Sequence, residues 1–208
     1  MIKFEHTEVI GWEHAIRGMR NPLNSWEKSD TTYGLGEDYY TDMEIGPNDL
    51  DLMTRLRNAG TDHRKFMRML TVYVDITAPL YWWKEFDTYK VGTVANSCST
   101  MHKIHAKEFT LDDFSFDHIP SEIQEVLERG TIRALNIARE SFLETKDKDY
   151  WWMMIQLLPT SYNQKRTVML NYEVLANMYK SRKNHKLDEW HELCHWIENL
   201  PYSELITD

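Results

Sequence analysis

The segment Leu70–Thr77 constrains the fold most strongly, because hydrophobic side chains alternate along it with Thr, Tyr and Asp. Successive side chains of an extended chain point to opposite sides, so this pattern predicts a β-strand with one face in a hydrophobic core. The side chains on the predicted core face are Leu70, Val72, Val74 and Ile76. Ala78-Pro79 ends the strand, and the aromatic segment Leu80–Tyr89 predicts a helix with proline at its first turn.

Most of the other periodic segments predict helices. We expect a first strand within residues 1–10 and further helices over 12–20, 48–59, 122–144, 149–158 and 187–200. Ser121 and Gln124 form the pattern of a capping box at the start of helix 122–144, and Gly130 weakens the middle of that helix. Residues 21–47 and 91–100 have little periodicity and are predicted to be loops. Because the long helices follow the strands instead of alternating with them, the pattern favours an α+β fold, in one domain over residues 1–208.

Residues 165–183 contain neither glycine nor proline, so nothing in this stretch breaks a helix. On a helix, Asn171 and Arg182 share one face and stand about 16 Å apart along the axis. The side chains between them on that face are Val174, Leu175 and Met178. Polar groups at the ends of a mostly buried stripe need partners. These partners are either neighbouring groups of the protein, such as helix ends and carboxylates, or a bound ligand.

The composition argues against several classes of protein. A formal net charge of −9 at pH 7 argues against non-specific binding to nucleic acid, which needs Lys and Arg to displace counterions. No apolar run of 18 residues and no signal-peptide pattern is present, and two cysteines are too few for a disulfide framework, so we expect a cytoplasmic protein without a membrane span. Eight Trp and eleven Tyr predict buried aromatic clusters, an oligomer interface or a pocket for a flat ligand. The aromatic residues of loop 21–47 that are candidates for covering such a ligand are Trp26, Tyr33, Tyr39 and Tyr40.

Residues 191–195, His-Glu-Leu-Cys-His, match the zinc motif H-E-x-x-H. On a helix, His191 and His195 share a face and Glu192 is placed to act as a general base. A zinc hydrolase needs a third ligand, and Glu198 and Pro201 occupy the places of the Gly and His of the extended motif. The alternative is a surface helix whose hydrophobic side chains pack inward. The sequence contains no nucleophile elbow, P-loop or G-x-G-x-x-G motif.

Three segments resemble the flavin-dependent thymidylate synthases, in the same order as in that family. In the family a strand that ends in Ala-Pro leads into a helix, an Arg-His-Arg triplet and, after seven or eight residues, a Ser. Here residues 88–90 (Thr-Tyr-Lys) take the place of the triplet, and Ser99 follows after eight residues. Upstream of the strand, His63 matches the position of a histidine that contacts flavin in the family.

The C-terminal segment carries the most specific part of the resemblance. The family has Leu-Pro, an Asn, a second Asn six residues on, an Arg five residues beyond it, and then a Trp. This chain has Leu158-Pro159, Asn171, Asn177, Arg182 and Trp190. The resemblance covers roughly residues 48–200. It implies a small antiparallel sheet packed with several long helices, bound FAD, and an active site shared between the subunits of a homotetramer.

The sequence departs from the family pattern at several positions that would grip a nucleotide. Only one cation, Lys90, remains of the Arg-His-Arg triplet, and Ile155 stands where an Arg precedes Leu-Pro. Lysine does not reproduce the bidentate fork of arginine. The Gln that contacts the pyrimidine appears as Glu85, and an ionised carboxylate only accepts hydrogen bonds. This change favours a base that presents an amino group, or loss of the reaction.

The resemblance implies a reaction in which reduced FAD supplies a hydride and a one-carbon unit passes to C5 of a pyrimidine nucleotide, dUMP or a related one. Methylenetetrahydrofolate and NADPH are the implied co-substrates. The residues implied to bind the cofactor are His63, Asn171, Asn177 and Lys90. The residues implied in catalysis are Arg182 and Ser99, which with Glu85 also contact the nucleotide. Two alternatives stand beside this enzyme: an altered or inactive homologue that binds a nucleotide or serves in assembly, and the zinc hydrolase.

Overall fold

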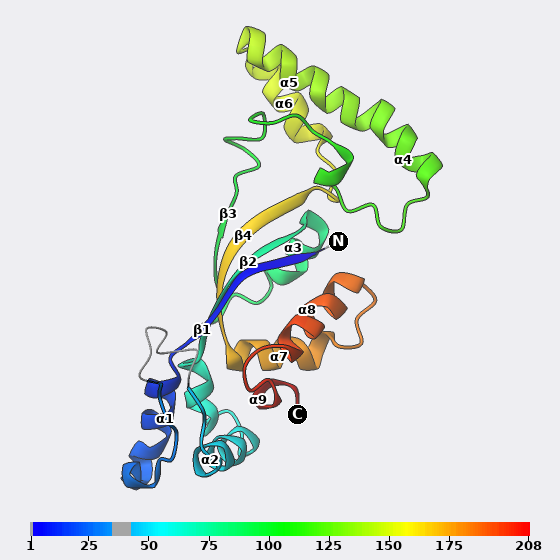
Figure 1. Ribbon diagram of the computed structural model, residues 1–208. Coiled ribbons are helices and arrows are strands. Elements are labelled where there is room, and N and C mark those ends of the chain that lie inside the picture. The colour runs from blue at the N-terminus through cyan, green and yellow to red at the C-terminus, as the bar shows by residue number, and fades with distance from the viewer. Residues whose placement is uncertain (1, 35–42) are drawn as a thin grey trace. The chain divides into compact units, whose positions relative to one another are not determined.

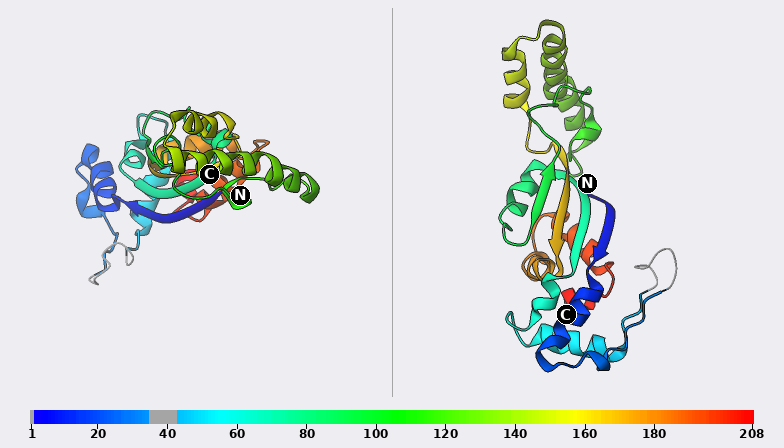
Figure 2. Two further views of the ribbon diagram at one scale, coloured as in Figure 1. Left: turned by 90° about the horizontal axis from the view of Figure 1, so that it is seen from above. Right: turned by 90° about the vertical axis from the view of Figure 1, so that its left-hand side faces the viewer.

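The computed structural model describes residues 2–34 and 43–208 (Figure 1). Within these residues four strands form one antiparallel sheet in the order β1-β2-β4-β3. The strands are β1 (Lys3–Ile10), β2 (Thr71–Pro79), β3 (Val94–Ser97) and β4 (Asn163–Asn171). The right-hand view of Figure 2 shows β2 and β4 side by side, with β1 and β3 as the edge strands. The predicted α+β class with a small antiparallel sheet and several helices is confirmed.

The alternating pattern of the predicted central strand is confirmed residue by residue. Leu70, Val72, Val74 and Ile76 are at most 1% exposed. Tyr73, which points to the opposite face, is 37% exposed. The predicted loop 91–100, in contrast, contains β3, and all four residues of this edge strand are exposed. An exposed strand has no hydrophobic face, and therefore no alternation in its sequence that could predict it.

The chain divides into two compact units, and each strand of the sheet has residues in both. Unit 1 contains the N-terminal residues to Glu5, residues 75–88 and residues 95–167. Unit 2 contains residues 6–74, 89–94 and 168–208.

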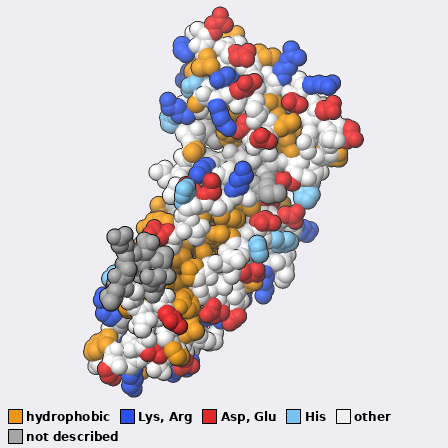
Figure 3. All heavy atoms as spheres, in the orientation of Figure 1, with side chains coloured by type: hydrophobic (Ala, Val, Ile, Leu, Met, Phe, Trp, Pro, Cys, Tyr) orange, Lys and Arg blue, Asp and Glu red, His pale blue; other side chains and the backbone are white. Residues whose placement is uncertain are grey.

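Unit 1 carries four helices among its described residues: α3 (Leu80–Phe86), α4 (Ser121–Leu127), α5 (Arg133–Thr145) and α6 (Lys148–Leu157). The helix predicted over 122–144 is divided by a π-helical turn, Glu128–Ile132, which contains Gly130. The predicted capping box is wrong, because Pro120 precedes the first turn and Gln124 Nε2 instead donates to the carbonyl of Ile119 at 2.7 Å. Acidic and basic side chains are interspersed over α4, α5 and α6 on the face shown in Figure 3.

Unit 2 carries the helices α1 (Trp12–Arg20), α2 (Pro47–Asn58), α7 (Tyr172–Arg182), α8 (Asp188–Glu198) and α9 (Glu204–Thr207). A short 3-10 helix, η3 (Arg64–Arg68), precedes β2. Trp12 packs edge-on against Tyr172 and Tyr202, so α1 is held to α7 and to the turn before α9. None of the helices in the described part of the chain combines the length and the apolar character that a membrane crossing requires.

A buried ion pair anchors the predicted loop 21–47. Arg20 Nε donates to Asp49 Oδ1 at 2.7 Å, and the two side chains are 4% and 0% exposed. The second carboxylate oxygen of Asp49 accepts hydrogen bonds from the hydroxyls of Ser29 and Thr31, both at 2.7 Å. Burial raises the pKa of the Asp49 carboxyl, but the bonds from Thr31, Ser29 and Arg20 outweigh it, so the pKa lies below its ordinary value. Tyr39 and Tyr40 lie outside the described residues.

We expect Asp49→Asn to lower the free energy of unfolding by roughly 3 kcal/mol at pH 7, because it leaves the Arg20 guanidinium buried without its counter-charge. A depressed pKa stabilises the folded state above the ordinary value of 3.8, and this stability is lost as pH falls below it. The acid dependence of unfolding below about pH 4 should therefore be shallower in the variant.

Urea unfolding followed by tryptophan fluorescence at pH 7 and at about pH 3 measures both effects. Asp51→Asn is the control, since Asp51 on the same helix pairs with Arg55 while both side chains are more than 60% exposed. Equal urea midpoints for the Asp49 and Asp51 variants would contradict this account.

Candidate functional site

The junction of β4 and α7 organises the candidate site in unit 2. The uninterrupted helix predicted over 165–183 is wrong in its first part, because residues 163–171 form β4. Val168 and Leu170 are buried, whereas Thr167 is exposed and Met169 is only partly buried, which is the alternation of a strand. Asn171 ends this strand and caps the helix: its side-chain Oδ1 accepts a hydrogen bond from the backbone N–H of Val174 at 3.0 Å.

Gly92 lies against this cap. Its φ of +78° is a left-handed conformation, and a Cβ added at Gly92 would stand 3.0 Å from Asn171 Nδ2 and 2.9 Å from a methyl carbon of Val174. The segment that follows the Thr88-Tyr89-Lys90 triplet therefore passes close to the first turn of α7. Lys90, the last residue of the triplet, is exposed.

Arg182 lies in the last turn of the same helix and is partly buried. The stripe predicted between Asn171 and Arg182 is present, with Leu175 and Met178 fully buried. Arg182 Nε donates a hydrogen bond to the phenol oxygen of Tyr89 at 2.9 Å. The segment Tyr89–Gly92 thus contacts both ends of α7.

Asn177 points to the other side of α7, where it lines a cavity of about 370 Å³. The cavity is strongly basic: its cationic side chains are Arg57, Arg64, Lys180 and Lys183, and the carboxylate among its lining residues is Asp208. Burial lowers the pKa of Arg57, Asp208 opposes this effect, and the neighbouring charge of Arg64 reinforces it. The Nε atom of Arg64 is buried and has no hydrogen-bond partner among the residues that the structure describes. These features suit an anionic ligand, which would supply both a counter-charge and acceptor oxygens.

His63 lines a different cavity, about 770 Å³ in volume and mostly hydrophobic. Its apolar lining residues include Leu23, Leu52, Leu56, Phe66 and Met69. The neighbouring residue Arg64 belongs to the basic cavity of Asn177, so the start of η3 contributes to both. The two predicted cofactor residues His63 and Asn177 line separate cavities.

The other predicted site residues belong to unit 1. Glu85 is partly buried near the end of α3. The Ser99 hydroxyl oxygen accepts hydrogen bonds from the backbone N–H groups of Met101 at 3.1 Å and His102 at 2.9 Å, so it stabilises a turn. Cys98, one residue earlier, stands at the seven-residue spacing from the triplet and lines a cavity.

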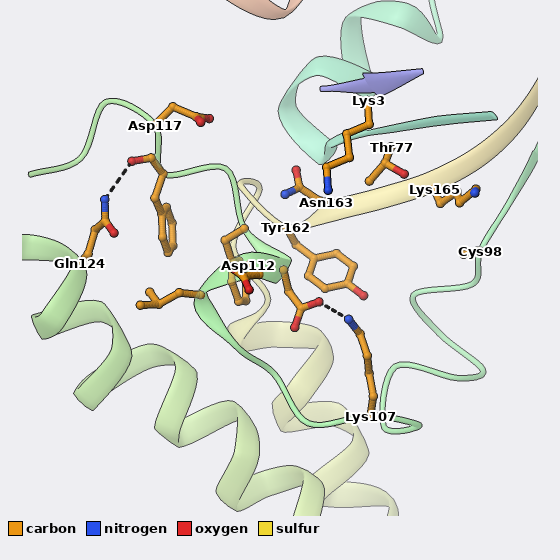
Figure 4. A pocket seen from close by; sticks show the side chains of 14 residues that line it. Lys3, Thr77, Cys98, Lys107, Asp112, Asp117, Gln124, Tyr162, Asn163 and Lys165 are labelled. Carbon is orange, nitrogen blue, oxygen red and sulfur yellow. Dashed lines mark hydrogen bonds and ion pairs between the residues drawn. The ribbon is translucent and has the colours of Figure 1, made fainter. Parts of the chain in front are cut away.

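The cavity beside Cys98 has a volume of about 830 Å³ and lies within unit 1 (Figure 4). Lys3, Thr77 and Lys165 line it from three strands. Most of its lysines have counter-charges: Lys165 Nζ lies 3.1 Å from both Glu5 and Asp75, and Lys107 pairs with Asp113. The hydrogen bond that the Lys107 ammonium donates to the Asp113 carboxylate raises the pKa of Lys107.

Sequence reasoning missed this cavity, because its walls come from strands, a 3-10 turn and a helix that are far apart in the chain. The one signal in the sequence is the shorter of the two family spacings, which places Cys98 and not Ser99 at the position of the family Ser.

The H-E-x-x-H residues lie on α8. The nearest carboxylates are Asp188, 4.0 Å from the Nδ1 atom of His191, and Glu198, 3.6 Å from the Nδ1 atom of His195. Both imidazoles are at least half exposed. Within the described residues, no group of three His, Cys, Asp or Glu side chains is placed to share a metal ion. Trp190, Leu193, Cys194 and Ile197 face the core, as the surface-helix alternative predicts.

Comparison with known proteins finds similarity at the level of structure. No family model matches the sequence, and no curated protein sequence is significantly similar. Thymidylate synthase X (ThyX) from Helicobacter pylori, solved with FAD and dUMP, matches with a TM-score of 0.72 and 16% identity, over 100% of this chain and 96% of that chain. A second structure of H. pylori flavin-dependent thymidylate synthase ThyX, complexed with FAD and dUMP, gives 0.68 and 17%, over 100% and 98%.

A UMP/dUMP methylase, PolB from Streptomyces cacaoi bound with 5-Br dUMP, matches with a TM-score of 0.60 and 13% identity, over 100% of this chain and 93% of that chain. This chain has the fold of the flavin-dependent thymidylate synthases at low sequence identity, so the resemblance identified in the sequence is confirmed in the fold.

Replacing Gly92 with Ala tests the contact between the triplet segment and α7. We expect Gly92→Ala to lower the free energy of unfolding by about 1–3 kcal/mol, since it adds a methyl group against Asn171 and Val174 at a positive φ. Gly130→Ala is the matched control: a Cβ at Gly130 meets no atom within 4 Å, and alanine favours the helix. Thermal unfolding of both variants gives the comparison, and an unchanged melting temperature in Gly92→Ala would contradict the close contact.

Proposed function

We propose that this protein is a flavin-dependent enzyme that methylates a pyrimidine nucleotide. Reduced FAD would be the hydride source, methylenetetrahydrofolate the carbon donor and dUMP or a related nucleotide the acceptor. The observation that carries the proposal is the basic cavity at Asn177 beside α7, the helix that Asn171 caps and that ends at Arg182. It is supported by the shared fold, because both H. pylori ThyX structures were solved with FAD and dUMP.

The residues of the basic cavity fit a group that carries phosphates. Arg64 has a buried N–H donor without a partner, and the charges of Arg57, Lys180 and Lys183 outweigh that of Asp208. A pyrophosphate presents several acceptor oxygens and negative charge, which matches this set of donors. We propose that Asn177 and Arg64 hold the phosphate-bearing part of FAD. When bound, FAD supplies the hydride chemistry, which no amino-acid side chain provides.

In this proposal the protein contributes binding, orientation and electrostatic stabilisation. Arg182 stabilises negative charge on the pyrimidine or its phosphate. Asn171 uses its carbonyl oxygen as a helix cap, so its amide nitrogen is the group that remains to donate to a ligand. We assign Ser99 and Glu85 to the nucleotide site and His63 and Lys90 to the flavin. An ionised Glu85 accepts hydrogen bonds only, which favours a base that presents an amino group.

We further propose that residues 1–208 act as one functional domain in a cytoplasmic homotetramer, with NADPH as the reductant of the flavin. A second candidate function is a nucleotide-binding or assembly protein that has lost the reaction. It is favoured by Tyr89, because this residue of the former Arg-His-Arg triplet makes its hydrogen bond within the protein, to Arg182.

Binding of FAD to the basic cavity can be tested directly. We expect the wild-type protein to bind FAD, with an absorbance band that survives desalting, and Arg64→Gln to weaken binding by about tenfold or more, as for loss of a charged hydrogen bond. Arg55→Gln is the control, because Arg55 is exposed and lines none of the cavities described here.

Flavin fluorescence titration measures the dissociation constants, and raising the salt concentration should weaken binding by wild type more than by Arg64→Gln. Failure of the wild-type protein to retain flavin after incubation with excess FAD would refute the flavin-enzyme proposal and favour the binding or assembly protein. Equal weakening in Arg64→Gln and Arg55→Gln would place the flavin outside the basic cavity.

A further inference from the structure

The guanidinium of Arg182 is held on two aromatic side chains from different segments of unit 2. Its central carbon lies 4.4 Å from the centroid of the Trp190 ring and 5.5 Å from that of the Tyr89 ring. Its Nε donates to the Tyr89 phenol oxygen at 2.9 Å. The two rings stand edge to face, with centroids 6.1 Å apart and an interplanar angle of 62°. The contact with Trp190 holds the guanidinium carbon over an aromatic ring, and the hydrogen bond to Tyr89 restricts the rotation of the guanidinium there.

Both aromatic residues are themselves fixed. Trp190 is fully buried on α8, and its ring also packs edge-on against His185. Tyr89 is partly buried and belongs to the segment that Gly92 brings against the Asn171 cap and Val174. Arg182 therefore contacts two side chains, Tyr89 and Trp190, that are already ordered in the folded protein.

We infer that Tyr89 is a positioning residue. Together with Trp190, which packs against the guanidinium, it orients Arg182 towards the nucleotide. The inference rests on the proposed function, because it assigns Tyr89 a role in binding a pyrimidine nucleotide through Arg182. A free arginine side chain populates many rotamers, and ordering it on binding costs conformational entropy. Because the contacts to Tyr89 and Trp190 form when the protein folds, this entropy is lost before the nucleotide binds. The nucleotide therefore binds to a guanidinium that is already oriented.

The inference also explains the degenerate triplet. Tyr89 stands where the resembling family has the His of Arg-His-Arg, and Thr88 and Lys90 replace the two arginines. In this chain the middle position holds a cation of α7 in place. The Tyr89 side chain accepts the Nε–H bond and packs edge to face against Trp190 in one conformation, and phenylalanine cannot do both because it lacks the acceptor oxygen.

The test compares Tyr89→Phe with the wild type in two measurements. Phenylalanine keeps the ring and removes the acceptor oxygen. The first measurement is the NMR signal of the Arg182 Nε–H, which we expect to exchange slowly with water in the wild type and at least several-fold faster in Tyr89→Phe. The second is the dissociation constant for dUMP, which we expect to rise about tenfold while the melting temperature stays within a degree or two.

Tyr73→Phe is the matched control, since Tyr73 lies on β2 in the same unit, is exposed, and has no contact with α7 among those described here. A double-mutant cycle with Arg182→Lys makes the test specific. Lysine has no Nε–H to donate in this geometry, so Tyr89→Phe should have little further effect on dUMP binding in the Arg182→Lys background.

Three results would overturn the inference, and they differ from one another. An unchanged Arg182 Nε–H signal in Tyr89→Phe would show that the bond does not orient the guanidinium. Equal dUMP affinity of wild type and Tyr89→Phe would remove the role of Tyr89 in binding but leave the proposed function intact. Absence of dUMP binding by the wild type would overturn the proposed function and the nucleotide role of Tyr89 together, whatever the NMR signal shows.

Discussion

The side-chain cap of Asn171 is the interaction on which the candidate site depends. Asn171 is the last residue of the central strand β4, and its side-chain oxygen accepts a hydrogen bond from the first turn of α7. The cap thereby sets the direction in which the helix leaves the sheet. A cap of this kind contributes only about 1 kcal/mol to stability. Its structural effect is larger, because Asn177 and Arg182 occupy their positions only if the helix begins at Tyr172. The same side chain meets Gly92, so the cap also fixes the path of the triplet segment.

The two ends of α7 are stabilised by different interactions, because the N-terminus has unpaired N–H groups and the C-terminus has unpaired carbonyl groups. At the N-terminus the helix offers unpaired N–H groups, and an amide oxygen satisfies one of them. At the C-terminus a cation is favourable, and Arg182 is placed there with aromatic faces as its support. Away from this helix, the Arg20–Asp49 pair anchors the loop after α1. Four hydrogen bonds from this loop are donated to one carboxylate oxygen of Asp49.

Sequence patterns predicted those parts of the fold in which burial follows a strict period. Strand β2 could be predicted because the buried side chains Val72, Val74 and Ile76 occupy every second position. Helices α1 and α8 could be predicted because their buried side chains recur at helical spacing. Strand β4 was missed because Lys165 and Arg166 interrupt its alternation, and β3 because it buries nothing. In the site, the helical period predicted the buried side chains Leu175 and Met178, but Asn171 ends β4 and caps the helix instead of lying on its face. The basic cavity, the Cys98 cavity and the Tyr89 contact join distant segments, which no local pattern encodes.

The contact between Tyr89 and Arg182 has a consequence for how this kind of chain evolves. Two positions 93 residues apart are tied by one hydrogen bond, so neither can drift freely without the other. Among diverged relatives, we expect the identities of these two positions to covary, and an acceptor-bearing aromatic residue at position 89 to accompany arginine at position 182. A search that demands the triplet alone would pass over chains built in this way.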